Sequence, residues 1–292
     1  YKRQLRYNSF MRERNTRETD TEGNCAFGDG FFKGLFPNNN GRDFFKLEGE
    51  ALEAWKNKYG DKIVDFGAGK LNNTRTLRNA GVFVSAFEPY FVTTGDTIHK
   101  EKSIEIANKF LDEVESGAEY TSVFISSVFN SVPFMEDRIK IAQIVAALCS
   151  PGGRVVCWCQ SNESQQFVIT KKHSVTNNAR LTFDLDYEPN TVLGDISKHP
   201  KVQKGHTADE LKDIFSRSFK SIDRIDMISK FWYLEATKPT VNPERLAEAL
   251  DFEFDLPYPD GTTLGLADRA RKVFEKRLGI TLPGKEETGH GD

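Results

Sequence analysis

The sequence contains no apolar run close to the roughly 18 residues that a membrane-spanning helix requires. It also has no apolar segment of the kind that forms the centre of a secretory signal peptide. Neither sign of charge prevails, because 40 lysine and arginine residues stand against 43 acidic residues, a net charge of −3. The 292 residues, 38% of them apolar, are enough to bury a core without disulfides or metals. We therefore expect an ordinary globular protein without a membrane segment.

Cysteine is scarce, with four residues at positions 25, 149, 157 and 159. Cys157 and Cys159 would point to one face of a strand, and no second close pair completes the quartet of a structural zinc site. Unpaired cysteines in such positions behave as small buried hydrophobes. The sequence therefore predicts no metal site, and the cytoplasm is the expected setting because it keeps thiols reduced.

The composition divides the chain into three parts. Residues 1–44 form a basic and aromatic extension, whose first 17 residues carry six basic side chains against one acidic side chain. Such an arm fits either a phosphate-seeking element or a solvated terminus. Residues 45–240 alternate strand-like and helix-like segments, as expected of one folded domain. Residues 241–292 form a small appendix, and we expect its last ten residues to be disordered.

Alternating strand and helix patterns in the central part predict an α/β fold with a mostly parallel sheet covered by helices. The expected parallel strands cover residues 62–66, 82–87, 122–129 and 154–159. Helical spacing falls between them, at residues 45–59, 74–79, 103–114 and 136–148. Two late strands, residues 221–227 and 231–237, are close enough in sequence to form an antiparallel pair.

The strongest chemical signal follows the first predicted strand. Asp65, Gly67, Ala68 and Gly69 lie in the run VDFGAG, between this strand and a helix. Glycines in such a turn let the backbone bend sharply and approach a ligand with no side chains in the way. Open α/β sheets bind their ligands at the carboxyl ends of the strands, so the sequence predicts a ligand at this turn.

Glu88 and Pro89 end the second predicted strand, in the run SAFEP. A carboxylate at this point can accept both hydroxyl hydrogens of a ribose. Dinucleotide-binding folds share this feature, but their fingerprint requires a third glycine where this chain has Asn72. The structural alternative is a tight turn without a ligand, in which the carboxylate only caps a helix.

Five segments taken in order resemble class I S-adenosylmethionine-dependent methyltransferases: VDFGAG, AFEPY, SVFISSVFNSVPF, LCSPGGRVV and FWYLEATKP. The resemblance implies a Rossmann-like sheet of seven strands that ends in an antiparallel hairpin, with S-adenosylmethionine as cofactor. In that family the acid equivalent to Asp65 lies near the methionine amino group, and the acid equivalent to Glu88 binds the ribose hydroxyls. We therefore expect cofactor contacts from Asp65, Gly67, Ala68, Gly69, Glu88, Pro89 and Ser126.

The acceptor side departs from the family pattern. Ser126 and Ser127 stand near the end of the third predicted strand, where the family often has an acidic residue. The following Asn130, Pro133 and Phe134 are similar, with an insertion, to the Asn-Pro-Pro-Phe pattern of enzymes that methylate base amines. In those enzymes the polar side chain takes the amine hydrogens and the aromatic ring stacks on the base. The alternative is a turn in which Asn130 caps the helix that follows.

The nature of the acceptor rests on a looser resemblance. DFGAG, FEPY and VFNSVP resemble segments of methyltransferase-like proteins found beside bacterial and phage DNA-modification systems. Together with the basic arm, this favours a nucleic acid as substrate, and DNA in particular. The alternatives are a small-molecule or protein methyltransferase, a cofactor-binding partner protein without turnover, and an enzyme that transfers another part of the cofactor. His173 and His206 are candidate general bases, although His206 precedes a capping box and also fits a structural role.

Overall fold

A computed structural model describes residues 24–25, 45–92, 98–163, 180–182, 189–194, 201–228 and 230–284. Most of the predicted basic and aromatic extension lies outside these residues, as do His173 and nearly all of the tail that the sequence predicts to be disordered. In the part of the chain that the structure describes, no helix is long and apolar enough to cross a membrane.

The main sheet has six strands in the order β10-β11-β6-β5-β3-β4. Four neighbouring strands are parallel, and β11 and β10 complete the sheet as an antiparallel pair. This arrangement confirms the predicted Rossmann-like sheet with its terminal hairpin. The strands are β3 (Lys62–Phe66), β4 (Phe83–Phe87), β5 (Tyr120–Ser126), β6 (Cys149–Gln160), β10 (Phe219–Ile228) and β11 (Phe231–Pro239).

The expected count of seven strands is wrong for this sheet. After β4 the described chain makes only an isolated bridge between Val92 and Ile98, and it then enters α5 (Lys100–Glu115). A further parallel strand would need its own crossover of a dozen or more residues, and residues 88–99 are too few for both. Strand β4 is therefore the edge of the main sheet.

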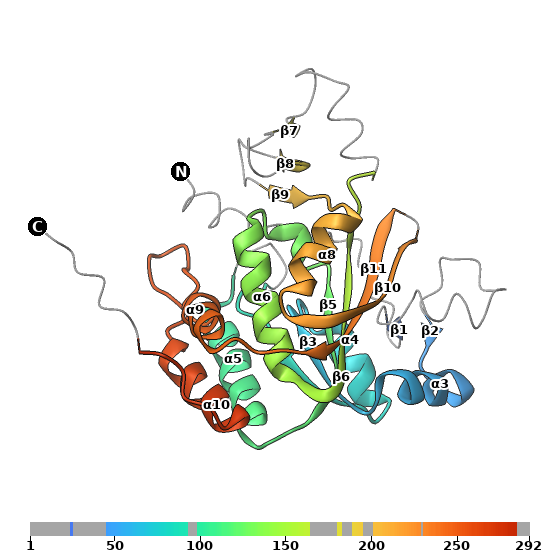
Figure 1. The fold of residues 1–292 in the computed structure, drawn as a ribbon, viewed down its shortest axis with the longest axis horizontal. Helices are drawn as coiled ribbons and strands as arrows, with labels where there is room; N and C mark the ends of the chain where they lie inside the picture. Colours follow the sequence, from blue (N-terminus) through green and yellow to red (C-terminus); the bar gives the residue numbers. More distant parts are fainter. Residues whose placement is uncertain are drawn as a thin grey trace, which may run out of the picture.

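Helices cover both faces of the sheet (Figure 1). On one face, Trp55, Tyr59 and Leu77 pack against β3, β4 and β5. The other face holds the larger core, in which the two C-terminal helices share one apolar cluster with the helices of the central part. The first face carries α3 (Gly49–Tyr59) and α4 (Asn72–Asn79), and the second carries α5, α6 (Met135–Leu148), α8 (Ala208–Ser216), α9 (Pro243–Glu253) and α10 (Ala267–Leu278).

A second sheet lies beyond the carboxyl ends of the parallel strands (Figure 1). It consists of β7 (Arg180–Thr182), β8 (Thr191–Gly194) and β9 (Lys201–Lys204), all antiparallel. These three strands were not predicted within the polar stretch that follows β6. A short 3-10 helix, η1 (Phe129–Ser131), follows β5, and β1 (Asn24–Cys25) pairs with β2 (Phe45–Lys46).

Candidate cofactor site

The turn between β3 and α4 is attached to the end of β4. Gly67 and Gly69 have φ angles of 79° and 62°, which glycine adopts without the strain that a Cβ atom causes. The N–H groups of Gly67 and Ala68 both donate to the Phe87 carbonyl oxygen, at 2.8 and 3.0 Å. The glycine-containing turn is therefore held in place by backbone hydrogen bonds to the neighbouring strand.

Asp65 ends β3 with a buried carboxylate. One of its oxygens accepts a hydrogen bond from the Thr74 hydroxyl, in the first turn of α4, at 2.5 Å. Leu71, the residue before α4, has a φ of 62° and no side chain caps the helix. A non-glycine residue with this φ is strained. The turn from Asp65 to α4 is thus held in an unusual backbone conformation.

Glu88 joins this turn to the one that follows β4. Its side chain is buried, and one carboxylate oxygen accepts from the Gly69 N–H group at 2.6 Å. The other oxygen accepts from the Tyr90 N–H group at 3.0 Å, and Pro89 between them is buried. A carboxylate has about four acceptor positions, more than these two backbone groups use. Glu88 can therefore fix both turns and still accept hydrogen bonds from a ligand.

The end of β5 forms the third side of the same region. Ser126 lies two residues beyond Phe124, the register partner of Asp65, and is therefore level with Gly67. A Cβ atom on Gly67 would lie only 2.3 Å from Val128 Cγ2, so no larger residue fits at this position without movement. The structure thus brings the predicted cofactor residues together at the ends of β3, β4 and β5: Asp65, Gly67, Ala68, Gly69, Glu88, Pro89 and Ser126.

The three predicted acceptor-side residues follow β5 in one loop. Asn130 is buried in η1, and its Oδ1 accepts from the Gln160 N–H group at the end of β6, at 2.8 Å. The interpretation of Asn130 as the cap of the following helix is wrong, because Phe134 is the N-cap residue of α6 and no side chain caps it. Pro133 is buried, and the Phe134 side chain is only 3% exposed. The Phe134 ring therefore offers almost no accessible face to a base.

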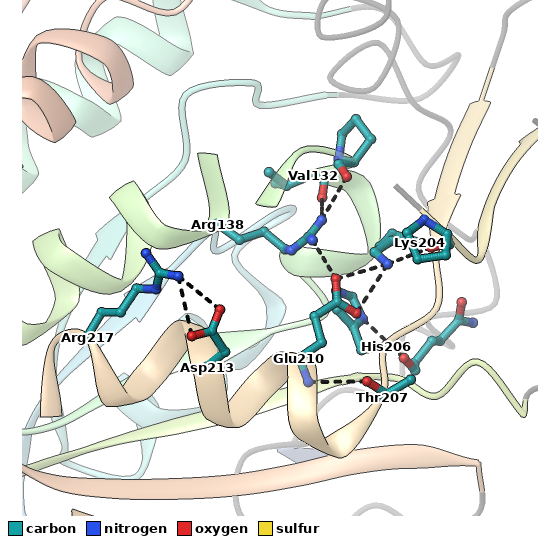
Figure 2. Close-up of polar contacts among 11 residues, drawn as sticks. Val132, Arg138, Lys204, His206, Thr207, Glu210, Asp213 and Arg217 are labelled. Atoms are coloured by element: carbon teal, nitrogen blue, oxygen red, sulfur yellow. Dashed lines mark hydrogen bonds and ion pairs between the residues drawn. The ribbon is translucent and has the colours of Figure 1, made fainter. Parts of the chain in front are cut away.

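A buried group of charges holds this loop (Figure 2). Arg138 donates to the carbonyl oxygens of Val132 and Pro133 at 2.7 and 2.8 Å, and to the Glu210 carboxylate at 2.6 Å. Lys204, in β9, forms an ion pair with the same carboxylate at 3.0 Å. Both cations are fully buried. One carboxylate of α8 thus joins the loop after β5 to the second sheet.

His206 lies beside this group and is also fully buried. Its Nδ1 lies 3.2 Å from the Gln160 carbonyl oxygen. Burial, followed by the positive charges of Arg138 and Lys204, lowers the pKa of His206 well below its usual range, against the opposite effect of Gln160. The ring is therefore neutral and enclosed, which supports the structural role rather than that of an exposed general base.

Sequence reasoning missed Arg138 and Lys204, and it predicted Glu210 only as a member of the capping box that begins at Thr207. A signal was present for Arg138, which stands three residues before Ile141 and seven before Val145, on the apolar side of α6. A charge at such a position predicts a buried partner. The partner could not be named, because Glu210 is 72 residues away in the sequence.

Comparison with known proteins gives only remote similarities. No protein-family model matches the sequence, and no curated protein matches it. Among solved structures, a methyltransferase from Methanosarcina mazei is 15% identical, with 62% of this chain and 93% of that chain covered and a TM-score of 0.44. The CcbJ methyltransferase from Streptomyces caelestis is 13% identical, with 65% of this chain and 89% of that chain covered and a TM-score of 0.43. The glycopeptide N-methyltransferase MtfA is 14% identical, with 64% of this chain and 92% of that chain covered and a TM-score of 0.40. At these scores the similarities assign no function, so the proposal below depends on the geometry of this chain.

The close approach of Gly67 to Val128 gives a first expectation. Gly67→Ala should lower the free energy of unfolding by about 2 to 4 kcal/mol, because a positive φ and a steric overlap act together. Gly81→Ala is the matched control. Its φ is 78°, but the nearest atom to its added Cβ is Lys56 Nζ at 3.9 Å, so the loss should be only about 1 to 2 kcal/mol. Equal losses in urea denaturation would show that the contact with Val128 does not constrain the turn.

The buried ion pairs give a second expectation. Arg138→Met should lower the free energy of unfolding by about 3 kcal/mol, because it leaves carbonyl groups and part of a buried ion pair without their partner. Arg217→Met is the control, since the pair between Arg217 and Asp213 lies at the surface of α8 (Figure 2). That change should cost less than about 1 kcal/mol. A loss for Arg138→Met no larger than for Arg217→Met would contradict the role given to Arg138.

Proposed function

We propose that this chain binds S-adenosylmethionine at the carboxyl ends of β3 and β4 and transfers its methyl group to an acceptor. The observation that carries the proposal is the position of Glu88, a buried carboxylate at the end of β4 that holds the glycine turn after β3. Carboxylates accept hydrogen bonds from paired ribose hydroxyls more strongly than neutral groups do. A nucleoside ligand explains why an acidic side chain is kept in this buried place.

The neighbouring groups fit the remaining parts of the cofactor. The turn at Gly67 and Gly69 brings backbone next to Glu88 without intervening side chains, which lets a ligand lie close to the main chain. The buried carboxylate of Asp65 at the adjacent strand end has the charge that suits the ammonium group of the methionine part. These assignments follow the resemblance described above and are part of the proposal.

The chain contributes positioning to the reaction. When bound, the cofactor supplies an electrophilic methyl group on its sulfonium centre, and transfer requires an acceptor atom held in line at about 3 Å. We assign the acceptor side to the loop after β5, where Asn130 orients the acceptor through its amide group. Its bond to Gln160 fixes the orientation of this amide, and Arg138 fixes the backbone of the same loop.

We propose a nucleic acid, and DNA in particular, as the acceptor. The similarity of Asn130, Pro133 and Phe134 to base-amine methyltransferases and the basic arm support this choice. Two observations favour the second candidate, a small-molecule or protein acceptor. The Asn130 oxygen, which would take the amine hydrogens, already accepts from Gln160, and the Phe134 ring, which would stack on the base, is buried.

Binding of the cofactor tests the first half of the proposal. Glu88→Ala should weaken the binding of S-adenosylhomocysteine about 100-fold, since two charge-assisted hydrogen bonds to the ribose are lost. Glu101→Ala, which removes an exposed carboxylate from the first turn of α5, should leave the dissociation constant unchanged. Calorimetry measures both, with thermal unfolding as a check of folding. Undiminished binding by a folded Glu88→Ala variant would refute the proposed site.

Transfer of label tests the second half. The purified protein is incubated with methyl-labelled S-adenosylmethionine and, separately, with DNA, RNA, protein and small-metabolite pools. We expect label in DNA, reduced at least about tenfold with the Glu88→Ala variant. Label confined to the protein or metabolite pool would support the second candidate, and label in none of them would contradict methyl transfer.

A further inference from the structure

A carboxylate interrupts the apolar face of α9. Leu246 and Leu250 are fully buried on this face, and Glu253 follows at the same helical spacing with only 5% of the residue exposed. Burying an ionisable group is costly unless another group pairs with it. Among the residues that the structure describes, none forms a hydrogen bond or an ion pair with the Glu253 side chain. The residue is therefore largely buried without the partner that such burial requires.

The charges around Glu253 have mostly the same sign as a carboxylate. The negative charges of Asp137, in α6, and Glu88, in the turn after β4, both act on its carboxyl group. Lys140 is the nearby cation, but its Nζ lies 3.4 Å from Asp137 and 4.2 Å from the centre of the Phe252 ring. Burial, followed by the charges of Asp137 and Glu88, raises the pKa of Glu253 to about 8, while Lys140 lowers it. At neutral pH the unliganded group is therefore mainly a neutral carboxyl, with one donor and one acceptor.

The segment after Glu253 is fastened to the turn that contains Glu88. The Tyr258 hydroxyl donates to the Pro89 carbonyl oxygen at 3.2 Å, and the Tyr90 hydroxyl donates to the Pro257 carbonyl oxygen at 3.1 Å. In addition, the ring of Phe254 lies 4.9 Å from that of Phe87 at the end of β4. These reciprocal contacts make the C-terminal segment a wall of the region beside Glu88.

These contacts also suggest where each part of the proposed cofactor would lie. The glycine turn contacts the Glu88 carboxylate through Gly69, and the C-terminal segment is bonded to Pro89 and Tyr90, which follow Glu88 in the chain. In the proposed cofactor the ribose joins the methionine part to the adenine. With the methionine part at the glycine turn and the ribose at Glu88, the adenine extends toward the C-terminal segment.

We propose that Glu253 is a cofactor-binding residue that recognises the adenine of S-adenosylmethionine. This inference rests on the proposed function and deepens it. The adenine edge displays an amino donor beside a ring-nitrogen acceptor, and a carboxyl group that holds its proton can pair with both at once. The bound base thus supplies the hydrogen bonds that Glu253 lacks. Since β4 is the edge of the sheet, α9 provides a residue where no further strand is present among the described residues.

The test measures S-adenosylhomocysteine binding by calorimetry at neutral pH, alongside an analogue with unsubstituted purine in place of adenine. Purine keeps the ring-nitrogen acceptor but lacks the amino donor, so it forms one hydrogen bond fewer with a carboxyl group. Wild type should bind the analogue at least about tenfold more weakly than it binds S-adenosylhomocysteine. Glu253→Leu should bind S-adenosylhomocysteine about tenfold more weakly than wild type does, and its affinities for the two ligands should differ by less than about threefold. Glu253→Gln keeps one donor and one acceptor and should bind adenine within about threefold of wild type. Glu248→Gln, on the exposed face of α9, is the control and should match wild type.

The outcomes separate this inference from the proposed function. If wild type binds neither ligand, the proposed function itself fails. If wild type binds S-adenosylhomocysteine and the Glu253→Leu variant binds it equally well, the role of Glu253 is refuted and the site at Glu88 stands. Should the leucine variant fail to fold, the wild-type comparison decides, because equal affinity for the adenine and purine ligands also refutes adenine recognition.

Discussion

The buried carboxylate of Glu88 is the interaction on which the site depends. It accepts from the backbone of the glycine turn after β3 and from the backbone of the turn after β4, so one side chain joins two loops that belong to different strands. Backbone N–H groups that are buried without acceptors are costly. Glu88 accepts from two such N–H groups at the carboxyl ends of the parallel strands. The same carboxylate is the group that suits the hydroxyls of a ribose.

Two other parts of the molecule pack near these strand ends. The second sheet and α8 are joined to the loop after β5 through one carboxylate, Glu210, which holds two buried cations. The C-terminal helices pack into the core beneath α5 and α6 and send Glu253 and Tyr258 toward the turn of Glu88. These parts of the chain outside the parallel sheet thus pack against the strand ends that carry the proposed site.

Much of the fold could be predicted because its signals are local. Three such signals are the periodicity of the strands, the glycine turn after Asp65 and the capping box that begins at Thr207. Each of them is contained within a few consecutive residues. The number of strands could not be derived in this way, because it depended on a family resemblance and the connection after β4 is short. Glu253 and Arg138 were missed for another reason. Each is a charge on an apolar helix face, and the groups that surround it come from distant segments that only the folded chain brings together.

Hydrogen exchange with and without S-adenosylhomocysteine tests the central claim most directly. If a nucleoside is held between the strand ends, amide protection should increase in residues 66–71 and 88–92 on addition of the ligand. The second sheet, which lies on the proposed acceptor side, should change less. Saturating ligand that left both turns at their original exchange rates, or that protected only a distant surface, would contradict the site described for this protein.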